Sequence, residues 1–188
     1  MSELILASTS PYRKALLQRL GLAFRQVDPQ FIESLPGSMP VEALVLHNAI
    51  GKAESVLAQH PEATIIASDQ LAICDEMVLG KPGTVDKAIE QLTMLSGRSV
   101  TFLTSLALFN QRAKRHEIIP YTVIFRALSE TEIRNYVRLE NPIDCAGSFK
   151  SEGLGIALFE RMHGDDPTAL IGLPLIRLSQ WLSPLNPR

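Results

Sequence analysis

The sequence predicts an α/β or α+β domain built on a mixed β-sheet. Segments with helical periodicity separate the predicted strands along the whole chain. Short apolar runs, such as residues 4–7 and 64–70, are typical of strands buried on both faces. Two longer β-rich runs, 99–109 and 117–128, read instead as an antiparallel hairpin. Both kinds of strand together predict a mixed sheet.

The N-terminal part of the chain predicts a strand, a helix and a second strand. Ser10 is a good N-cap, and Pro11 stands at the first helical position, where a missing N–H costs nothing. Gly21 ends this helix. The elements expected next are a strand over 24–27, a Pro-rich loop over 28–40, a helix over 41–59 that ends before His60-Pro61, and a strand over 64–70.

The C-terminal part of the chain predicts shorter elements. Thr84 and Gly97 delimit an amphipathic helix, and Ser129 with Glu132 has the spacing of a capping box. The elements expected here are a hairpin or turn over 71–83, a helix over 84–97, the hairpin named above, a helix over 130–140, a strand over 155–161 within a loop-rich stretch, and a helix over 173–182.

Composition excludes several classes of protein. The 188 residues suffice for one domain, or for two small lobes that share a core. A net charge of −2 argues against a partner that is a nucleic acid polymer or a membrane surface. Cys74 and Cys145 have no metal-binding spacing, and we find no signal-peptide run and no apolar stretch long enough for a membrane span. We therefore expect a cytoplasmic protein with reduced thiols.

Reactive side chains follow the predicted strands. Ligands of open α/β sheets bind outside the carboxyl ends of the strands. Residues 8–13 follow the first strand, Glu33 lies beyond the second, and Asp69 with Gln70 closes the third. The helix N-terminus at Ser10 favours an anion, and Ser8, Ser10 and Arg13 add donors suited to phosphate oxygens.

Each of these residues also has a purely structural interpretation. Ser8 and Ser10 are explained by helix capping alone, and Tyr12 by a place on the core stripe of its helix. Lys52, Lys81 and Glu33 are explained as solvated surface charges. Asp69 is the most suspicious single residue, because a charge at the end of a buried strand is costly unless it is paired.

Taken together, the motifs resemble those of the Maf family of nucleotide pyrophosphatases. The resemblance rests on "LILASTSPYRKALLQRLGLAF", Glu33, Lys52-Ala53, "SDQ", "GKP", "CAGSFKSEG" and "GLPL", in this order from residue 4 to about residue 175. It implies a single domain over residues 1–188, with an elongated mixed-sheet α/β fold and a central cleft, similar to inosine triphosphate pyrophosphatases. It also implies hydrolysis of a nucleoside triphosphate to the monophosphate and pyrophosphate with a divalent metal, Mg²⁺ or Mn²⁺.

The resemblance assigns roles to residues. Ser8, Ser10, Arg13, Lys52 and Lys81 match the family's phosphate-binding positions, Asp69 its catalytic acid, and Glu33 its loop acid. Glu33 and Asp69 are the candidate ligands of the metal. A further three positions separate the branches of the family. Tyr12, Gln70 and Glu152 resemble the YceF branch, associated with 7-methyl-GTP, whereas the dTTP/UTP branch usually has Arg, Thr and Gln there.

Two departures from the family pattern bear on the function. Ile32 stands where the family commonly has Asp, which removes one carboxylate near the metal, and Lys14 replaces an Arg. The alternatives that stay open are a dTTP/UTP or broader modified-nucleotide pyrophosphatase, and a nucleotide-binding regulator linked to cell division without significant turnover. The apolar run 101–109 fits either the core or the surface of a homodimer.

Overall fold

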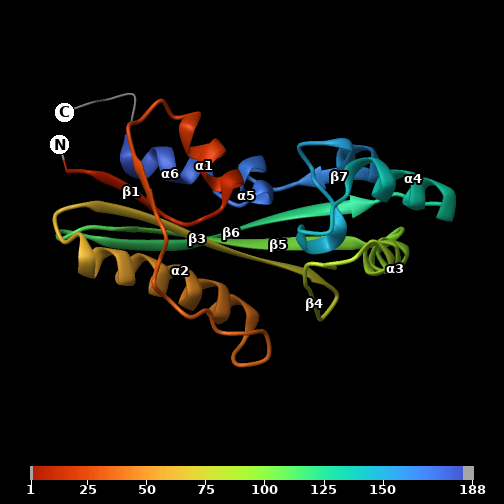
Figure 1. Ribbon diagram of the computed structural model, residues 1–188, viewed down its shortest axis with the longest axis horizontal. Helices are drawn as coiled ribbons and strands as arrows, with labels where there is room; N and C mark the ends of the chain where they lie inside the picture. Colours follow the sequence, from red (N-terminus) through yellow and green to blue (C-terminus); the bar gives the residue numbers. More distant parts are fainter. Residues whose placement is uncertain (1, 184–188) are drawn as a thin grey trace. The chain divides into compact units, whose positions relative to one another are not determined.

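The structure is a computed structural model that describes residues 2–183 (Figure 1). Helices and strands alternate along the chain, as the sequence predicts. The strands are β1 (Leu4–Ala7), β2 (Arg25–Val27), β3 (Thr64–Cys74), β4 (Met77–Leu79), β5 (Ser99–Phe109), β6 (Lys114–Phe125) and β7 (Phe159–His163). The α-helices are α1 (Pro11–Gln18), α2 (Val41–Gln59), α3 (Val85–Leu95), α4 (Glu130–Glu140), α5 (Pro167–Ile171) and α6 (Leu175–Leu182), and two 3₁₀ helices are η1 (Ala146–Ser148) and η2 (Leu154–Leu158).

The strands form one seven-stranded mixed sheet. Six strands follow the order β2-β1-β3-β5-β6-β7, and β4 pairs with β3. β1 runs parallel to both β2 and β3, whereas the β3–β4 and β6–β7 pairs are antiparallel. The predicted mixed sheet is therefore confirmed.

The chain divides into two compact units. The first contains residues 1–70, 103–119 and 166–188, and the second contains residues 71–102 and 120–165. The long strands β3, β5 and β6 contribute residues to both units. We describe each unit by itself.

In the first unit, the two crossover connections, β1–α1–β2 and β2–α2–β3, run in opposite directions across the sheet. The chain passes from β1 through α1 to β2 on one side, and then through α2 to β3 on the other side of β1. Because such parallel crossovers are right-handed, the two helices cover opposite faces of the sheet. Figure 1 shows α2 on one face, and α1 and α6 on the other. This reversal is the kind of point at which α/β sheets bind ligands.

The core of the first unit lies between α2 and the sheet. Small and branched apolar side chains alternate along the strands toward the helix. The buried cluster consists of Ile5, Ala7, Ala49, Ala53, Val56, Ala63, Ile65, Ala67, Ala107 and Phe109. Ala107 and Phe109 belong to the run 101–109, so this part of the run packs as core within the chain.

The second unit has an aromatic core. Four phenylalanine rings meet edge to face, with centroids 4.9–5.6 Å apart: Phe102, Phe125, Phe149 and Phe159. Helix α4 begins with the predicted capping box, in which Ser129 and Glu132 bond each other's backbone N–H groups. Thr84 caps α3 through the N–H of Lys87, also as predicted.

The predicted bounds of three strands are wrong. β3 continues past Gln70 to Cys74, because its second half pairs with β4 around the turn at Asp75. β6 begins at Lys114 and ends at Phe125, earlier at both ends than predicted, because a short turn at 110–113 closes the hairpin. Residues 154–158 form η2 rather than strand, and β7 begins only at Phe159.

Candidate active site

Ser8 and Ser10 build the turn between β1 and α1. The N–H of Ser8 donates to the carbonyls of Leu6 and Val27, which joins the ends of β1 and β2. The hydroxyl of Ser10 accepts the N–H of Arg13 at 3.3 Å, and the hydroxyl of Ser8 accepts the N–H of Ser10 at 3.1 Å. The capping interpretation is thus confirmed for Ser10, whereas Ser8 instead bonds the backbone of that cap residue. The phosphate-binding role of both serines remains a prediction.

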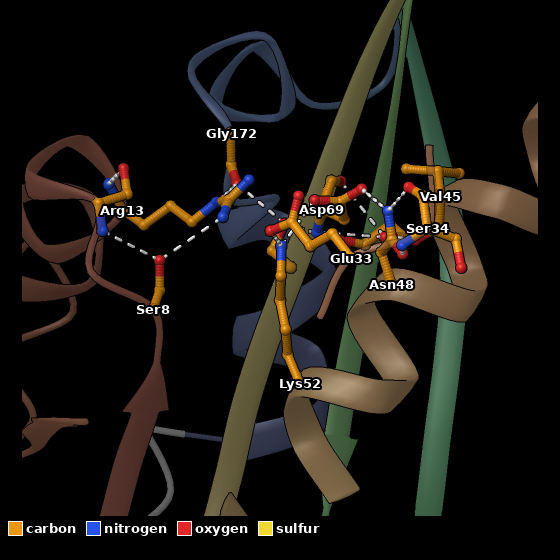
Figure 2. A network of polar contacts seen from close by, with 12 residues as sticks. Ser8, Arg13, Glu33, Ser34, Val45, Asn48, Lys52, Asp69 and Gly172 are labelled. Atoms are coloured by element: carbon orange, nitrogen blue, oxygen red, sulfur yellow. Dashed lines mark hydrogen bonds and ion pairs between the residues drawn. The ribbon is translucent and has the colours of Figure 1, made fainter. Parts of the chain in front are cut away.

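Arg13 extends from the first turn of α1 toward the end of α5. Its Nε donates to the carbonyl of Gly172 at 2.9 Å, and one terminal nitrogen lies 3.5 Å from the hydroxyl of Ser8 (Figure 2). Burial lowers the pKa of the Arg13 guanidinium, and the carboxylates of Asp69 and Glu33 oppose this shift. The guanidinium remains charged at neutral pH, so it places a fixed cation at this end of the sheet.

Asp69 and Lys52 form a buried ion pair. Lys52 Nζ lies 2.7 Å from Asp69 Oδ1, and the two residues are only 5% and 7% exposed. The other carboxylate oxygen of Asp69 accepts from Asn48 Nδ2 at 3.3 Å, and its backbone N–H donates to Ser105 Oγ. The interpretation of Lys52 as a solvated surface amine is therefore wrong, because its ammonium compensates a buried carboxylate.

Glu33 completes a small charged cluster with Lys52 and Asp69. Its carboxylate lies 2.6 Å from Lys52 Nζ, and its side chain is half-exposed. The ammonium of Lys52 thus lies between an interior carboxylate and one that solvent reaches (Figure 2). This arrangement gives the end of the first unit one exposed acid, one interior acid and two cations, Lys52 and Arg13.

The position of Asp69 within β3 differs from the prediction. The sequence indicated the end of a strand, whereas β3 runs on for five residues to Cys74. Parallel pairing with β1, however, is recorded only from Leu4–Thr64 to Leu6–Ile66. Asp69 therefore lies just beyond the part of β3 that pairs with β1. The predicted site is at the end of β1, as expected, but it is not at the end of β3.

The side-chain amide of Gln70 forms hydrogen bonds that hold α5 in place. Its amide nitrogen donates to Thr104 Oγ1 at 2.9 Å and to the carbonyls of Ala169 and Leu170 at 2.7 and 3.1 Å. These contacts fix the last turn of α5. Tyr12, the other residue of the first unit that is predicted to separate the branches, is half-buried on the first turn of α1.

Sequence reasoning missed five residues that support this cluster. They are small or polar, and each contacts groups that are distant in the sequence: Asn48, Ser68, Thr104, Ser105 and Gly172. Asn48 carried a usable signal, since it lies four residues before Lys52 and therefore on the same face of the helix. Ser68 and Gly172 lie within the quoted motifs "SDQ" and "GLPL", although no role was assigned to them, whereas local sequence gave no signal for Thr104 and Ser105.

Lys81 and Glu152 belong to the second unit. Lys81 is exposed in the segment after β4, and Glu152 is exposed in the loop before η2, where its carboxylate accepts from Ser151 Oγ. Glu140 shapes this loop by accepting the N–H of Leu154 at 2.8 Å, and a Cβ at Gly153 would overlap the Glu140 carboxylate. Their roles in phosphate and base binding remain predictions.

A metal would have two carboxylate ligands available in the first unit. Within residues 2–183, no cluster of three or more His, Cys, Asp or Glu side chains is arranged to hold a metal ion. In the first unit, Glu33 and Asp69 both lie within ion-pair distance of one cation, the Lys52 ammonium. No helix in the same described range is long and apolar enough to cross a membrane.

The fold has solved counterparts. A HAM1 protein from Coxiella burnetii aligns with 97% of this chain and 99% of its own, with a TM-score of 0.55 and 20% identity. The Ham1 protein of Staphylococcus aureus aligns with 98% of this chain and 100% of its own, with a TM-score of 0.54 and 14% identity. At these identities the similarity establishes a Ham1-like α/β fold.

Sequence comparison adds the family. A family model described as Maf-like protein matches residues 3–185. A 7-methyl-GTP pyrophosphatase from Pseudomonas aeruginosa is 50% identical over 97% of this chain and 96% of its own. Those from Alkalilimnicola ehrlichii and Vibrio cholerae are 52% and 50% identical, over 95% and 96% of this chain and 91% and 94% of their own. The chain belongs to the Maf family.

Proposed function

We propose that this protein hydrolyses 7-methyl-GTP to 7-methyl-GMP and pyrophosphate. The observation that carries the proposal is the cluster of Asp69, Lys52 and Arg13, beyond the carboxyl end of β1 at the reversal of strand order. The sequence identity of 50–52% to three proteins named 7-methyl-GTP pyrophosphatase supports it. The reaction would clear a modified nucleotide from the cytoplasmic pool.

In this proposal, the cations of the first unit bind the triphosphate. A triphosphate carries about four negative charges near neutral pH, and a chain of net charge −2 must meet them locally. Arg13, the hydroxyls of Ser8 and Ser10 and the N-terminus of α1 supply donors at one place. Lys52 supplies an ammonium group in the first unit, and Lys81, a residue of the second unit, is also proposed to bind phosphate.

Asp69 is the proposed catalytic carboxylate, and it acts as a general base. Lys52 and Asn48 fix the two oxygens of its carboxylate. Asp69 would orient a water molecule and accept its proton as the water oxygen forms a bond to the α-phosphorus. The bond from the α-phosphorus to the bridging oxygen breaks, and pyrophosphate leaves with that oxygen. Positioning and charge neutralisation then account for most of the rate enhancement.

A divalent cation, Mg²⁺ or Mn²⁺, fits the donor set of the first unit. Mg²⁺ is commonly held by one or two carboxylates together with substrate phosphates. Glu33 and Asp69 are the two residues that would hold it, and they already share the positive charge of Lys52. When bound, the metal would neutralise charge on the phosphates. Ile32 leaves the set with one carboxylate fewer than the usual family pattern, and its side chain is 94% exposed.

Tyr12 and Glu152 are the proposed specificity residues. Methylation at N7 makes the guanine ring cationic, which favours stacking on the aromatic face of Tyr12 by about 0.5–2 kcal/mol. The carboxylate of Glu152 would accept from the N1–H and the exocyclic amine of guanine. Gln70 would act on the base through the position of α5, since its amide nitrogen is already bonded to α5 carbonyls.

A panel of nucleotides tests the function. We expect pyrophosphate release from 7-methyl-GTP in the presence of Mg²⁺ to exceed that from GTP, dTTP and UTP. Equal or faster release from dTTP would contradict 7-methyl-GTP as the substrate, but it would be consistent with the proposed hydrolysis at the α-phosphorus. Binding without product from any nucleotide would instead favour the regulatory alternative.

A further inference from the structure

The loop that carries Glu33 is anchored along one face of α2. The ring of Phe31 packs on Gly51, where any Cβ would overlap it, and meets His47 edge to face at 5.8 Å. Glu33 pairs with Lys52, the residue that follows Gly51. The next loop residue, Ser34, bonds Asn48. The loop therefore follows the helix through contacts to positions 47, 48, 51 and 52.

Both the oxygen and the nitrogen of the Asn48 side-chain amide form hydrogen bonds in this region. Its Oδ1 accepts the N–H of Ser34 at 2.9 Å, and its Nδ2 donates to the carbonyl of Ser34 at 3.2 Å (Figure 2). The same Nδ2 donates to Asp69 Oδ2 at 3.3 Å. Since a backbone N–H can only donate, the contact with Ser34 fixes which way the amide points. The nitrogen must then face Asp69.

We propose that Asn48 is a positioning residue that couples the two acids of the site. One side chain, 3% exposed, sets the orientation of the Asp69 carboxylate and the position of the backbone next to Glu33. Lys52 restrains only one oxygen of Asp69, so that without Asn48 the carboxylate can rotate about that contact. This inference rests on the proposed hydrolysis of 7-methyl-GTP.

Two variants separate the contacts. Asn48→Asp is nearly isosteric and retains the acceptor for the Ser34 N–H, but it replaces the nitrogen that donates to Asp69 and to the Ser34 carbonyl with a carboxylate oxygen. Asn48→Ala removes every contact. If Asn48 only holds the loop, the Asp variant retains most of the activity. If it positions Asp69, both variants lose activity, because a hydrogen bond to a charged group is missing in each.

The experiment measures kcat and KM for 7-methyl-GTP in wild-type protein, Asn48→Asp and Asn48→Ala, with folding checked by circular dichroism. We expect kcat to fall about 10- to 100-fold in both variants while KM changes less than about threefold. Limited proteolysis should show faster cleavage within residues 28–40 in Asn48→Ala than in Asn48→Asp. Asn110→Asp is the matched control, because Asn110 uses only its Oδ1, in the turn before β6.

The outcomes are distinguishable. Wild-type kcat in folded Asn48→Asp would overturn the positioning role and leave the proposed function intact. An inactive wild-type protein on every nucleotide would overturn the proposed function itself. If Asn48→Ala does not fold, Asn48→Asp alone decides the question.

Discussion

Lys52 Nζ lies 2.7 Å from Asp69 Oδ1, and neither side chain is more than 10% exposed. A carboxylate at this depth requires a compensating charge, and a lysine on the buried face of α2 provides it, although lysine side chains usually face solvent. The pair thus explains both why Asp69 is tolerated inside the sheet and why Lys52 lies on the buried face of its helix.

Removal of the charge on Lys52 should destabilise the protein. Lys52→Met leaves the Asp69 carboxylate buried without its partner, at a cost of about 3–5 kcal/mol in the free energy of unfolding. Urea denaturation measures this change. Lys114→Met is a matched control, since Lys114 pairs with Glu54 at the same 2.7 Å on the surface and should cost less than about 1 kcal/mol.

The same pair predicts strong non-additivity. Asp69→Asn removes the charge that Lys52 compensates, so the double variant Lys52→Met/Asp69→Asn should be less destabilised than the sum of the two single variants. Simple additivity in the denaturation cycle would mean that the two groups do not interact.

Loss of the Asp69 carboxylate should remove activity with little effect on nucleotide binding. We expect Asp69→Asn to lower kcat by about 10²–10⁴-fold, the range typical of a general acid or base. Asp75→Asn is the matched control, because Asp75 is an exposed carboxylate in the turn between β3 and β4, at φ 54°, a conformation that asparagine tolerates. A kcat for Asp69→Asn within threefold of wild type would exclude the proposed role.

Sequence reasoning located elements well where local chemistry sets their ends. The bounds of α2 follow from Pro40 and from His60-Pro61, and the caps of α1, α3 and α4 were recognisable from Ser10, Thr84 and Ser129. β3 was predicted too short, because its last residues are strand only through pairing with β4. That pairing is a tertiary effect that the local pattern does not contain.

The part of the site that follows the end of β1 could be predicted from the sequence. The turn 8–13 and the suspicion attached to Asp69 came from strand patterns. The partners of these residues did not, because Arg13 and Gly172 are 159 residues apart in the chain, and Ser68 and Ser105 are 37 apart. Buried polar groups must find partners, but the sequence does not say which ones.

The capping box of α4 should make stability sensitive to acid. Bonds from Ser129, followed by Arg126, lower the pKa of Glu132 from 4.5 to about 2. A carboxyl whose pKa is lower in the folded protein stabilises it above pH 4.5 and loses that effect as the pH falls toward 2. The melting temperatures of wild type and Glu132→Gln should therefore converge as the pH falls from 4.5 to 2. Glu130→Gln is the control, because Glu130 does not accept hydrogen bonds from Ser129, and its melting temperature should not converge with that of wild type in this way. Parallel curves for Glu132→Gln and wild type would contradict the account.

Exchange of the specificity residues should change the substrate. Tyr12→Arg with Glu152→Gln introduces the residues usual in the dTTP/UTP branch and removes both groups proposed to contact a cationic guanine. We expect the ratio of kcat/KM for 7-methyl-GTP over dTTP to fall at least tenfold, as measured by pyrophosphate release. An unchanged ratio in the folded double variant would remove these residues from base recognition.

Removal of divalent metal should stop turnover. EDTA treatment is expected to abolish pyrophosphate release, and Mg²⁺ or Mn²⁺ to restore it. Glu33→Gln should raise the Mn²⁺ concentration needed for half-saturation, which electron paramagnetic resonance of free Mn²⁺ measures without reference to activity. Full activity in EDTA would show that the two acids do not hold a required metal.

The most direct test of the proposed chemistry is the position of oxygen transfer. Hydrolysis of 7-methyl-GTP in ¹⁸O-labelled water, followed by mass spectrometry of both products, identifies the phosphorus that the water attacks. Attack at the α-phosphorus predicts one ¹⁸O in 7-methyl-GMP and none in pyrophosphate, with loss of both products in Asp69→Asn. Label in pyrophosphate, or release of inorganic phosphate and a diphosphate, would contradict the proposed reaction.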